Sequence, residues 1–176
     1  MTSTAFRILV LCTGNSARSQ IAEALITAKG AMRQAGVVKG SSAGSRPAPR
    51  VNPFAVEILA RNGIAANGRV PQSIDDITGE KFALVITVCD NARDACPYFP
   101  GAAAQVHWGL PDPADHVDEN EAREAFAETY RALDARIEAL LALPLGELDA
   151  ETLVREAEAI HLAALASEES NRSSHQ

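Results

Sequence analysis

Length, composition and charge restrict the chain to a few classes of protein. It has 176 residues, enough for one well-filled hydrophobic core and too few for two ordinary domains. The formal net charge of −7 argues against nucleic acid or an anionic membrane surface as a partner. We recognise neither an apolar run of the roughly 20 residues that a membrane span requires nor a secretory signal, and we therefore expect a cytoplasmic protein.

The first half of the chain predicts strands that alternate with helices. The apolar run 6–11 is typical of a parallel strand covered on both faces. Apolar residues recur at helical spacing over 17–35, and a weaker strand follows at 37–43. An Asn-Pro pair at the start and a glycine just past the end delimit a helix over 53–62.

The second half continues this alternation after an irregular stretch at 67–79. Residues 82–88 and 105–108 predict two more strands, and a helical pattern runs from residue 121 to the Pro-Leu-Gly break at 144–146. A further helix is expected over 149–166, with a frayed tail after it. We predict an α/β fold of three layers, a four-stranded parallel sheet flanked by helices, with an extra C-terminal helix. Its ligand site should lie beyond the carboxyl ends of the strands.

The chain has three cysteines, and their positions are informative. Cys12 directly follows the first strand, whereas Cys89 and Cys96 lie seven residues apart after the third. In a reducing compartment free thiols are buried bystanders, catalytic groups or metal ligands. No convincing set of four ligands accompanies them, so a zinc site is not favoured and we predict no metal.

The run CTGNSARS at 12–19 predicts an oxyanion site around a nucleophilic cysteine. A loop that leads directly into a helix points several backbone N–H groups at one spot. Gly14 and Asn15 tolerate unusual backbone conformations, and Arg18 offers a planar fork to a tetrahedral oxyanion. We expect this field to lower the pKa of Cys12 below about 8.5, with a hydrogen bond from Ser19 to the sulfur. The predicted binding residues are Thr13, Gly14, Asn15, Ser16, Ala17, Arg18 and Ser19.

Residues 10–19 resemble the phosphate loop of low-molecular-weight protein tyrosine phosphatases and of the arsenate reductases that share their fold. The likeness continues in Ser-Ala-Gly at 42–44, Val-Asn-Pro at 51–53 and Trp-Gly-Leu-Pro-Asp-Pro at 108–113. The resemblance implies a phosphatase-like domain over 1–146, with 147–176 as a helical extension and tail. It also implies that Asp112 is the general acid, with Asp115 as its nearest competitor.

The two distal cysteines favour the reductase branch of that family. The segment 87–97, TVCDNARDACP, resembles the thioredoxin-coupled arsenate reductases, which use three cysteines. The resemblance implies that Cys12 attacks arsenate, that Cys89 forms a disulfide with Cys12, and that Cys96 then takes over Cys89. Phosphate or sulfate would mimic the substrate in this detoxifying reaction. No tightly bound cofactor is expected, because thioredoxin or a small-thiol system supplies the electrons.

Two other functions remain open on the sequence. One is a phosphatase acting on phosphotyrosine proteins or small phosphate esters, in which Cys89 and Cys96 are incidental or protective. The other is a non-catalytic oxyanion binder or arsenic sensor, which would leave the acid candidate and the paired thiols unexplained.

Strand geometry sharpens the redox prediction. If the first and third strands are neighbours, Cys12 and Cys89 end strands about 4.8 Å apart, and a disulfide needs Cα atoms within roughly 7 Å. If residues 89–96 are helical, Cys89 and Cys96 are separated by roughly 10 Å, so their disulfide requires this segment to unwind.

Some reductases of this family hold a structural potassium ion. The resemblance assigns an asparagine, a glutamate and a serine like Asn15, Glu23 and Ser42 to that site, together with an acidic residue. Residues 67–76 match the family loosely, and we place no acidic ligand there.

Overall fold

The computed structural model describes residues 4–33, 38–89 and 98–176. Its sheet has four parallel strands in the order β2-β1-β3-β4. The strands are β1 (Phe6–Cys12), β2 (Val38–Gly44), β3 (Leu84–Thr87) and β4 (Gln105–His107). All four lie within a residue or two of their predicted positions. Because β1 and β3 are neighbours, the chain segments that follow them start side by side.

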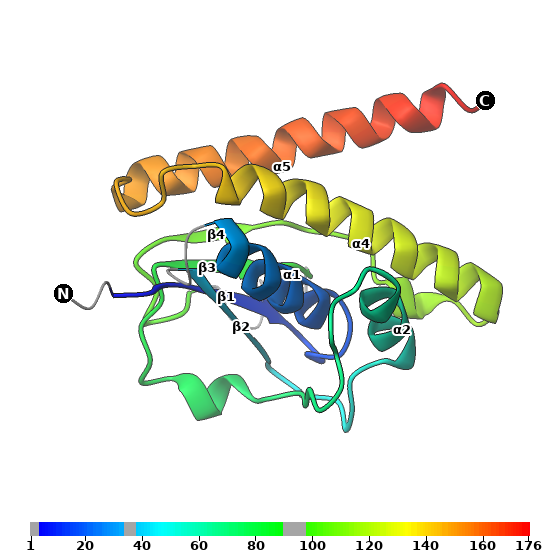
Figure 1. Ribbon diagram of the computed structural model, residues 1–176, viewed down its shortest axis with the longest axis horizontal. Coiled ribbons are helices and arrows are strands. Elements are labelled where there is room, and N and C mark those ends of the chain that lie inside the picture. Colours follow the sequence, from blue (N-terminus) through cyan, green and yellow to red (C-terminus); the bar gives the residue numbers. More distant parts are fainter. Residues whose placement is uncertain (1–3, 34–37, 90–97) are drawn as a thin grey trace.

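Helices of the described segments cover one face of this sheet, as Figure 1 shows. They are α1 (Arg18–Arg33), α2 (Pro53–Arg61), α4 (Glu119–Leu141) and α5 (Ala150–Ser173). Side chains of β1 alternate between two clusters: Ile8 and Val10 pack under the helices, and Leu9 and Leu11 pack on the opposite face. A strand buried on both faces is what a continuous apolar run predicts, so the predicted fold class is confirmed.

The other face of the sheet is covered by a segment that was predicted to be irregular. It contains a short 3-10 helix, η1 (Ile74–Ile77), whose Ile77 packs with Phe82 and Phe99 against the sheet. Ser73 caps η1 by accepting a hydrogen bond from the Asp75 amide. A single helical turn leaves too little periodicity for the sequence to reveal it.

Local signals set most helix boundaries. Asn52 accepts a hydrogen bond from the Phe54 amide at the start of α2, and Gly63 has a φ of 74° just after its end, as predicted. α4 starts two residues before the predicted position because Asp118 caps it through the Asn120 and Glu121 amides. The predicted end of α1 lies outside the described residues. None of the helices described is long and apolar enough to cross a membrane.

The C-terminal helix is longer than predicted. It was expected to end near residue 166, but α5 continues to Ser173. The fully buried Arg136 of α4 places its NH1 atom 2.6 Å from Glu168 Oε1, two residues beyond the predicted end. This ion pair holds α5 beyond the point where its regularly spaced apolar residues stop. The apolar periodicity therefore did not predict the last residues of the helix.

Two further hydrogen bonds fix α5 to the rest of the fold. Arg136 Nε donates to His161 Nδ1 at 3.0 Å. Trp108, directly after β4, donates from Nε1 to the Ala157 carbonyl at 3.0 Å, and its indole is almost fully buried. α5 is thereby joined to α4 and to the loop that leaves β4.

We predict that acid weakens the docking of α5. Burial lowers the pKa of His161, and Arg136 and His107 lower it further, against a smaller opposite effect of Glu168. Below about pH 6.5 His161 therefore binds a proton more readily in the unfolded chain than in the folded one. The free energy of unfolding falls as the pH drops for this reason. In urea unfolding between about pH 8 and pH 5, the native protein should lose more stability than His161→Gln. Equal losses would contradict this prediction.

Candidate active site

The predicted oxyanion loop is the turn between β1 and α1. Cys12 is the last residue of β1 and is only 4% exposed. The Asn15 amide points back and donates to Cys12 Sγ at 3.2 Å. Asn15 adopts a left-handed backbone with a φ of 48°, whereas Gly14 does not. Of the two residues expected to tolerate an unusual backbone, Asn15 is therefore the one that adopts it.

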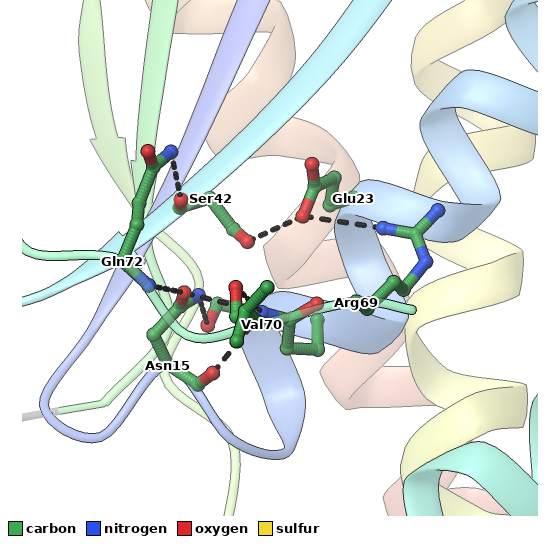
Figure 2. A network of polar contacts seen from close by, with 8 residues as sticks. Asn15, Glu23, Ser42, Arg69, Val70 and Gln72 are labelled. Carbon is green, nitrogen blue, oxygen red and sulfur yellow. Dashed lines mark hydrogen bonds and ion pairs between the residues drawn. The ribbon is translucent and has the colours of Figure 1, made fainter. Parts of the chain in front are cut away.

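The side chain of Asn15 explains why this residue carries the left-handed turn. Its Oδ1 accepts hydrogen bonds from the Gln72 amide at 2.9 Å and from Gln20 Nε2 at 3.1 Å. Its Nδ2 donates to Ser19 Oγ at 2.9 Å. Figure 2 shows Asn15 next to Gln72. Three hydrogen bonds to one fully buried amide offset the backbone strain and fix the loop.

The end of β2 approaches the loop so closely that it has no room for a side chain. A Cβ atom on Gly44 would lie 2.4 Å from the Thr13 carbonyl oxygen and 3.0 Å from the Asn15 amide nitrogen. The Ser-Ala-Gly segment predicted to belong to the second strand thus ends in a residue that the loop requires to be glycine.

Ser19 contacts the thiol as predicted, but the expected direction of the thiol pKa is wrong. Ser19 Oγ lies 2.9 Å from Cys12 Sγ. Burial raises the pKa of Cys12, and this outweighs the opposing hydrogen bonds from the Ser19 hydroxyl and the Asn15 and Ser19 amides. The nearby Cys89 also raises it. The sequence indicated the donors around the sulfur but not how completely water is excluded from it.

We predict that Ser19→Ala raises the pKa of Cys12 further. The variant removes the largest of the contributions that lower it. The pH dependence of Cys12 alkylation by iodoacetamide, followed by peptide mass mapping, measures the change. Ser16→Ala is a suitable control, because Ser16 Oγ donates to the Arg50 carbonyl and not to the thiol. An unchanged or lower Cys12 pKa in Ser19→Ala would contradict the prediction.

We call the oxyanion loop from Cys12 to Ala17 the cradle. Arg18, the first residue of α1, lies between the cradle and the loop after β4. Its NH1 donates to the Leu110 carbonyl at 2.7 Å, and its NH2 lies 3.3 Å from Asp112 Oδ2. Its buried Nε has no hydrogen-bond partner among the described residues. Two of the three guanidinium nitrogens therefore have protein partners, and the N–H of the third, Nε, is the one left for a bound oxyanion.

The structure distinguishes Asp112 from its competitor Asp115. Asp112 contacts Arg18, and its Oδ1 also accepts a hydrogen bond from the Ala114 amide at 3.0 Å. Asp115 lies at the exposed end of the short 3-10 helix η2 (Pro113–Asp115) and forms no ion pair with Arg18. Asp112 is thus the carboxylate next to the cradle.

The second thiol lies next to the cradle as the strand order requires. Leu11 of β1 pairs with Thr87 of β3, and Cys89 follows two residues later. Cys89 is buried and free, and its Sγ is 3.4 Å from Thr13 Oγ1. The predicted third thiol, Cys96, lies outside the described residues.

The sequence matches the low molecular weight phosphotyrosine protein phosphatase family over residues 7–157. The chain belongs to this family. Its resemblance to the family, drawn from short motifs, is therefore confirmed across most of the chain. The loop from Cys12 to Arg18 and the candidate acid Asp112 come from two of the segments that carried that resemblance, 10–19 and 108–113.

Within this phosphatase family the chain is similar to arsenate reductases. The arsenate reductase of Halalkalibacterium halodurans is 38% identical over 124 residues, covering 70% of this chain and 86% of the relative. The thioredoxin-dependent arsenate reductase of Corynebacterium glutamicum has a TM-score of 0.60 at 29% identity, covering 81% of this chain and 63% of that one. An arsenate reductase in its phosphate-binding state has a TM-score of 0.65 at 25% identity, covering 77% and 96%.

The residues that resemble the family's potassium site do not fit a potassium ion in this chain. Ser42 Oγ donates to Glu23 Oε2 at 2.6 Å, and Arg69 NH1 lies 3.3 Å from the same oxygen. Figure 2 shows the guanidinium facing this carboxylate. A potassium ion at the carboxylate would lie against a positive side chain. Over 4–33, 38–89 and 98–176 we also find no cluster of three or more His, Cys, Asp or Glu residues suited to a metal.

Three residues of the site were not anticipated. Gln20 and Gln72 hold Asn15, and Arg69 pairs with Glu23. Gln20 could have been found from the sequence, because an amide side chain in the first turn of α1 is close enough to hydrogen-bond the preceding loop. Gln72 and Arg69 lie in a segment without periodicity, and only the folded chain brings them to the loop.

Proposed function

We propose that this protein reduces arsenate to arsenite, with Cys12 as the nucleophile. The observation that carries the proposal is the second buried thiol, Cys89, at the cradle in which Cys12 lies. A phosphatase needs one cysteine there, whereas a reductase needs a second to receive the oxidising equivalents. The similarity to named arsenate reductases supports the same choice.

The first step forms a bond between Cys12 sulfur and arsenic. Because burial raises the pKa of the Cys12 thiol, its proton passes to an oxygen of the entering arsenate dianion. The thiolate attacks arsenic, and the free Nε–H of Arg18 and the loop amides stabilise the charge on the oxyanion. Asp112 protonates the departing oxygen, which leaves as water. Thr13, Gly14, Ser16 and Ala17 complete the binding loop.

The second step reduces arsenic. Cys89 gives its proton to an oxygen on arsenic and attacks Cys12 sulfur as a thiolate, so a sulfur–sulfur bond forms as the sulfur–arsenic bond breaks. The electron pair of the broken bond goes to arsenic, which changes from As(V) to As(III) and leaves as arsenite. The adjacency of β1 and β3 and the 3.4 Å contact between Cys89 Sγ and Thr13 Oγ1 support this attack.

The third step regenerates the nucleophile and rests on the resemblance of residues 87–97 to three-cysteine reductases. Cys96 attacks Cys89, forms the Cys89–Cys96 disulfide and releases the Cys12 thiolate. Thioredoxin or a small-thiol system then reduces that disulfide by exchange. In the cell this reaction would serve arsenic detoxification, with phosphate and sulfate as substrate mimics.

Arsenate-dependent NADPH oxidation in the presence of thioredoxin and thioredoxin reductase tests the proposal. The native protein should turn over many times, whereas Cys96→Ser should produce about one equivalent of arsenite and then stop. Full turnover by Cys96→Ser would exclude the third step. Rapid hydrolysis of phosphate esters without arsenate turnover would favour a phosphatase instead.

A further inference from the structure

Arg69 is the positive partner of a carboxylate inside the fold. Its guanidinium lies 3.3 Å from Glu23 Oε2, and the two side chains are only 22% and 24% exposed. Burial raises the pKa of Glu23, while the Ser42 hydroxyl and Arg69 act in the opposite direction. Without the guanidinium, Glu23 would be a buried charge next to a single hydroxyl, or it would take up a proton.

The segment that follows Arg69 holds the oxyanion loop. The Val70 carbonyl lies 3.5 Å from Gln20 Nε2, and the Gln72 amide donates to Asn15 Oδ1 at 2.9 Å. Gln72 also binds β2, because its Nε2 donates to the Ser42 carbonyl at 2.8 Å and its own carbonyl accepts from the Gly44 amide at 2.9 Å. Figure 2 shows Arg69, Val70 and Gln72 lying along the same path between Glu23 and Asn15.

The side chain of Val70 gives this segment little anchoring of its own. Val70 is 72% exposed and the next residue, Pro71, is only partly buried, so apolar burial contributes little to holding this stretch. The ion pair of Arg69 with Glu23 of α1 is the charged contact that ties the segment to the helix of the cradle. Loss of that contact would free the segment on one side of Asn15.

We infer that Arg69 is a positioning residue for the oxyanion site. By pairing with Glu23, Arg69 keeps Val70 and Gln72 against the loop. Gln72 in turn keeps Asn15 in its left-handed conformation, in which the backbone amide of Asn15 donates to Cys12 Sγ. The inference rests on the proposed function only in taking this loop as the substrate site. Because the chain itself supplies the cation for Glu23, oxyanion binding should not depend on which monovalent cation the buffer contains.

The test measures phosphate affinity and the pKa of Cys12, and it does not use arsenate turnover. Inorganic phosphate should protect Cys12 from iodoacetamide, and mass mapping of the Cys12 peptide gives both the phosphate affinity and the thiol pKa. Arg69→Met should bind phosphate roughly five- to tenfold more weakly and should raise the Cys12 pKa, because the Asn15 amide is no longer held on the sulfur. Arg69→Lys, which keeps the charge, should restore most of the affinity.

Arg61→Met is the matched control. Arg61 also pairs with a glutamate, Glu57, but it is exposed at the end of α2 and does not touch the cradle segment. Arg61→Met should have the phosphate affinity and the Cys12 pKa of the native protein. A folded Arg69→Met with native phosphate affinity and native Cys12 pKa would overturn the inference.

A second measurement needs no variant. The phosphate affinity of the native protein, measured in sodium, potassium and choline buffers of equal ionic strength, should agree within about twofold. A clear requirement for potassium would overturn the inference even if Arg69→Met failed to fold. Failure of arsenate turnover with these binding results intact would count against the proposed function and leave the role of Arg69 standing.

Discussion

Replacing Cys12 with serine is expected to lower arsenate turnover by a factor of about 10⁴ or more. A serine hydroxyl is a far weaker nucleophile at neutral pH, and its oxygen cannot form the disulfide that reduces arsenic. Arsenite production, separated chromatographically and quantified as arsenic, measures the loss. Phosphate binding should survive, because the Asn15 side chain and Arg18 are held by contacts that do not involve the sulfur.

Phosphate binding by Cys12→Ser is the control for this prediction. Titration calorimetry with inorganic phosphate should give affinities within a few-fold for the native protein and Cys12→Ser. Turnover by Cys12→Ser above a few per cent of the native rate would show that another residue attacks arsenic. Loss of binding together with turnover would show that the substitution had disrupted the loop.

Arg18→Lys is expected to lower kcat/KM for arsenate by about 10²- to 10³-fold. The guanidinium reaches the Leu110 carbonyl with one nitrogen and Asp112 with another, while its Nε–H has no partner in the described part of the chain and is left for the oxyanion. A lysine ammonium keeps the charge but cannot make all three contacts at once. The substitution therefore separates the effect of the planar fork from that of positive charge.

Steady-state kinetics on Arg18→Lys and on a control, Arg33→Lys, measures this effect. Arg33 lies at the other end of the same helix and pairs with Glu138, far from the cradle in the chain order. The control should keep native kinetics. A loss of less than about tenfold in Arg18→Lys would mean that charge alone suffices, and the role assigned to the fork would be wrong.

The layout of the fold and the position of the cradle could be predicted from sequence because their signals are local. The apolar run of β1, the Asn-Pro start of α2 and the Cys-to-Arg spacing each specify one element or one turn. Parallel strands then bring their carboxyl ends to one edge of the sheet, which places Cys89 near Cys12. Each of these predictions needed only the neighbouring residues and the general rules of α/β topology.

What could not be predicted depends on contacts between distant segments. The pKa of Cys12 reflects a balance between burial, which raises it, and hydrogen bonds from Ser19 and Asn15, which lower it, and the extent of burial is set by the whole fold. Arg69 lies in a segment without periodicity, and its partner Glu23 is on a helix 46 positions earlier in the chain. The length of α5 depends on Arg136 of α4 meeting Glu168.

A single-turnover experiment tests the central claim most directly. Fully reduced protein would receive one equivalent of arsenate without any reductant, followed by rapid alkylation, arsenic speciation and peptide mapping. We predict about one equivalent of arsenite together with one disulfide, between Cys12 and Cys89 in Cys96→Ser and between Cys89 and Cys96 in the native protein. Unchanged arsenate with all three thiols alkylated would contradict the account.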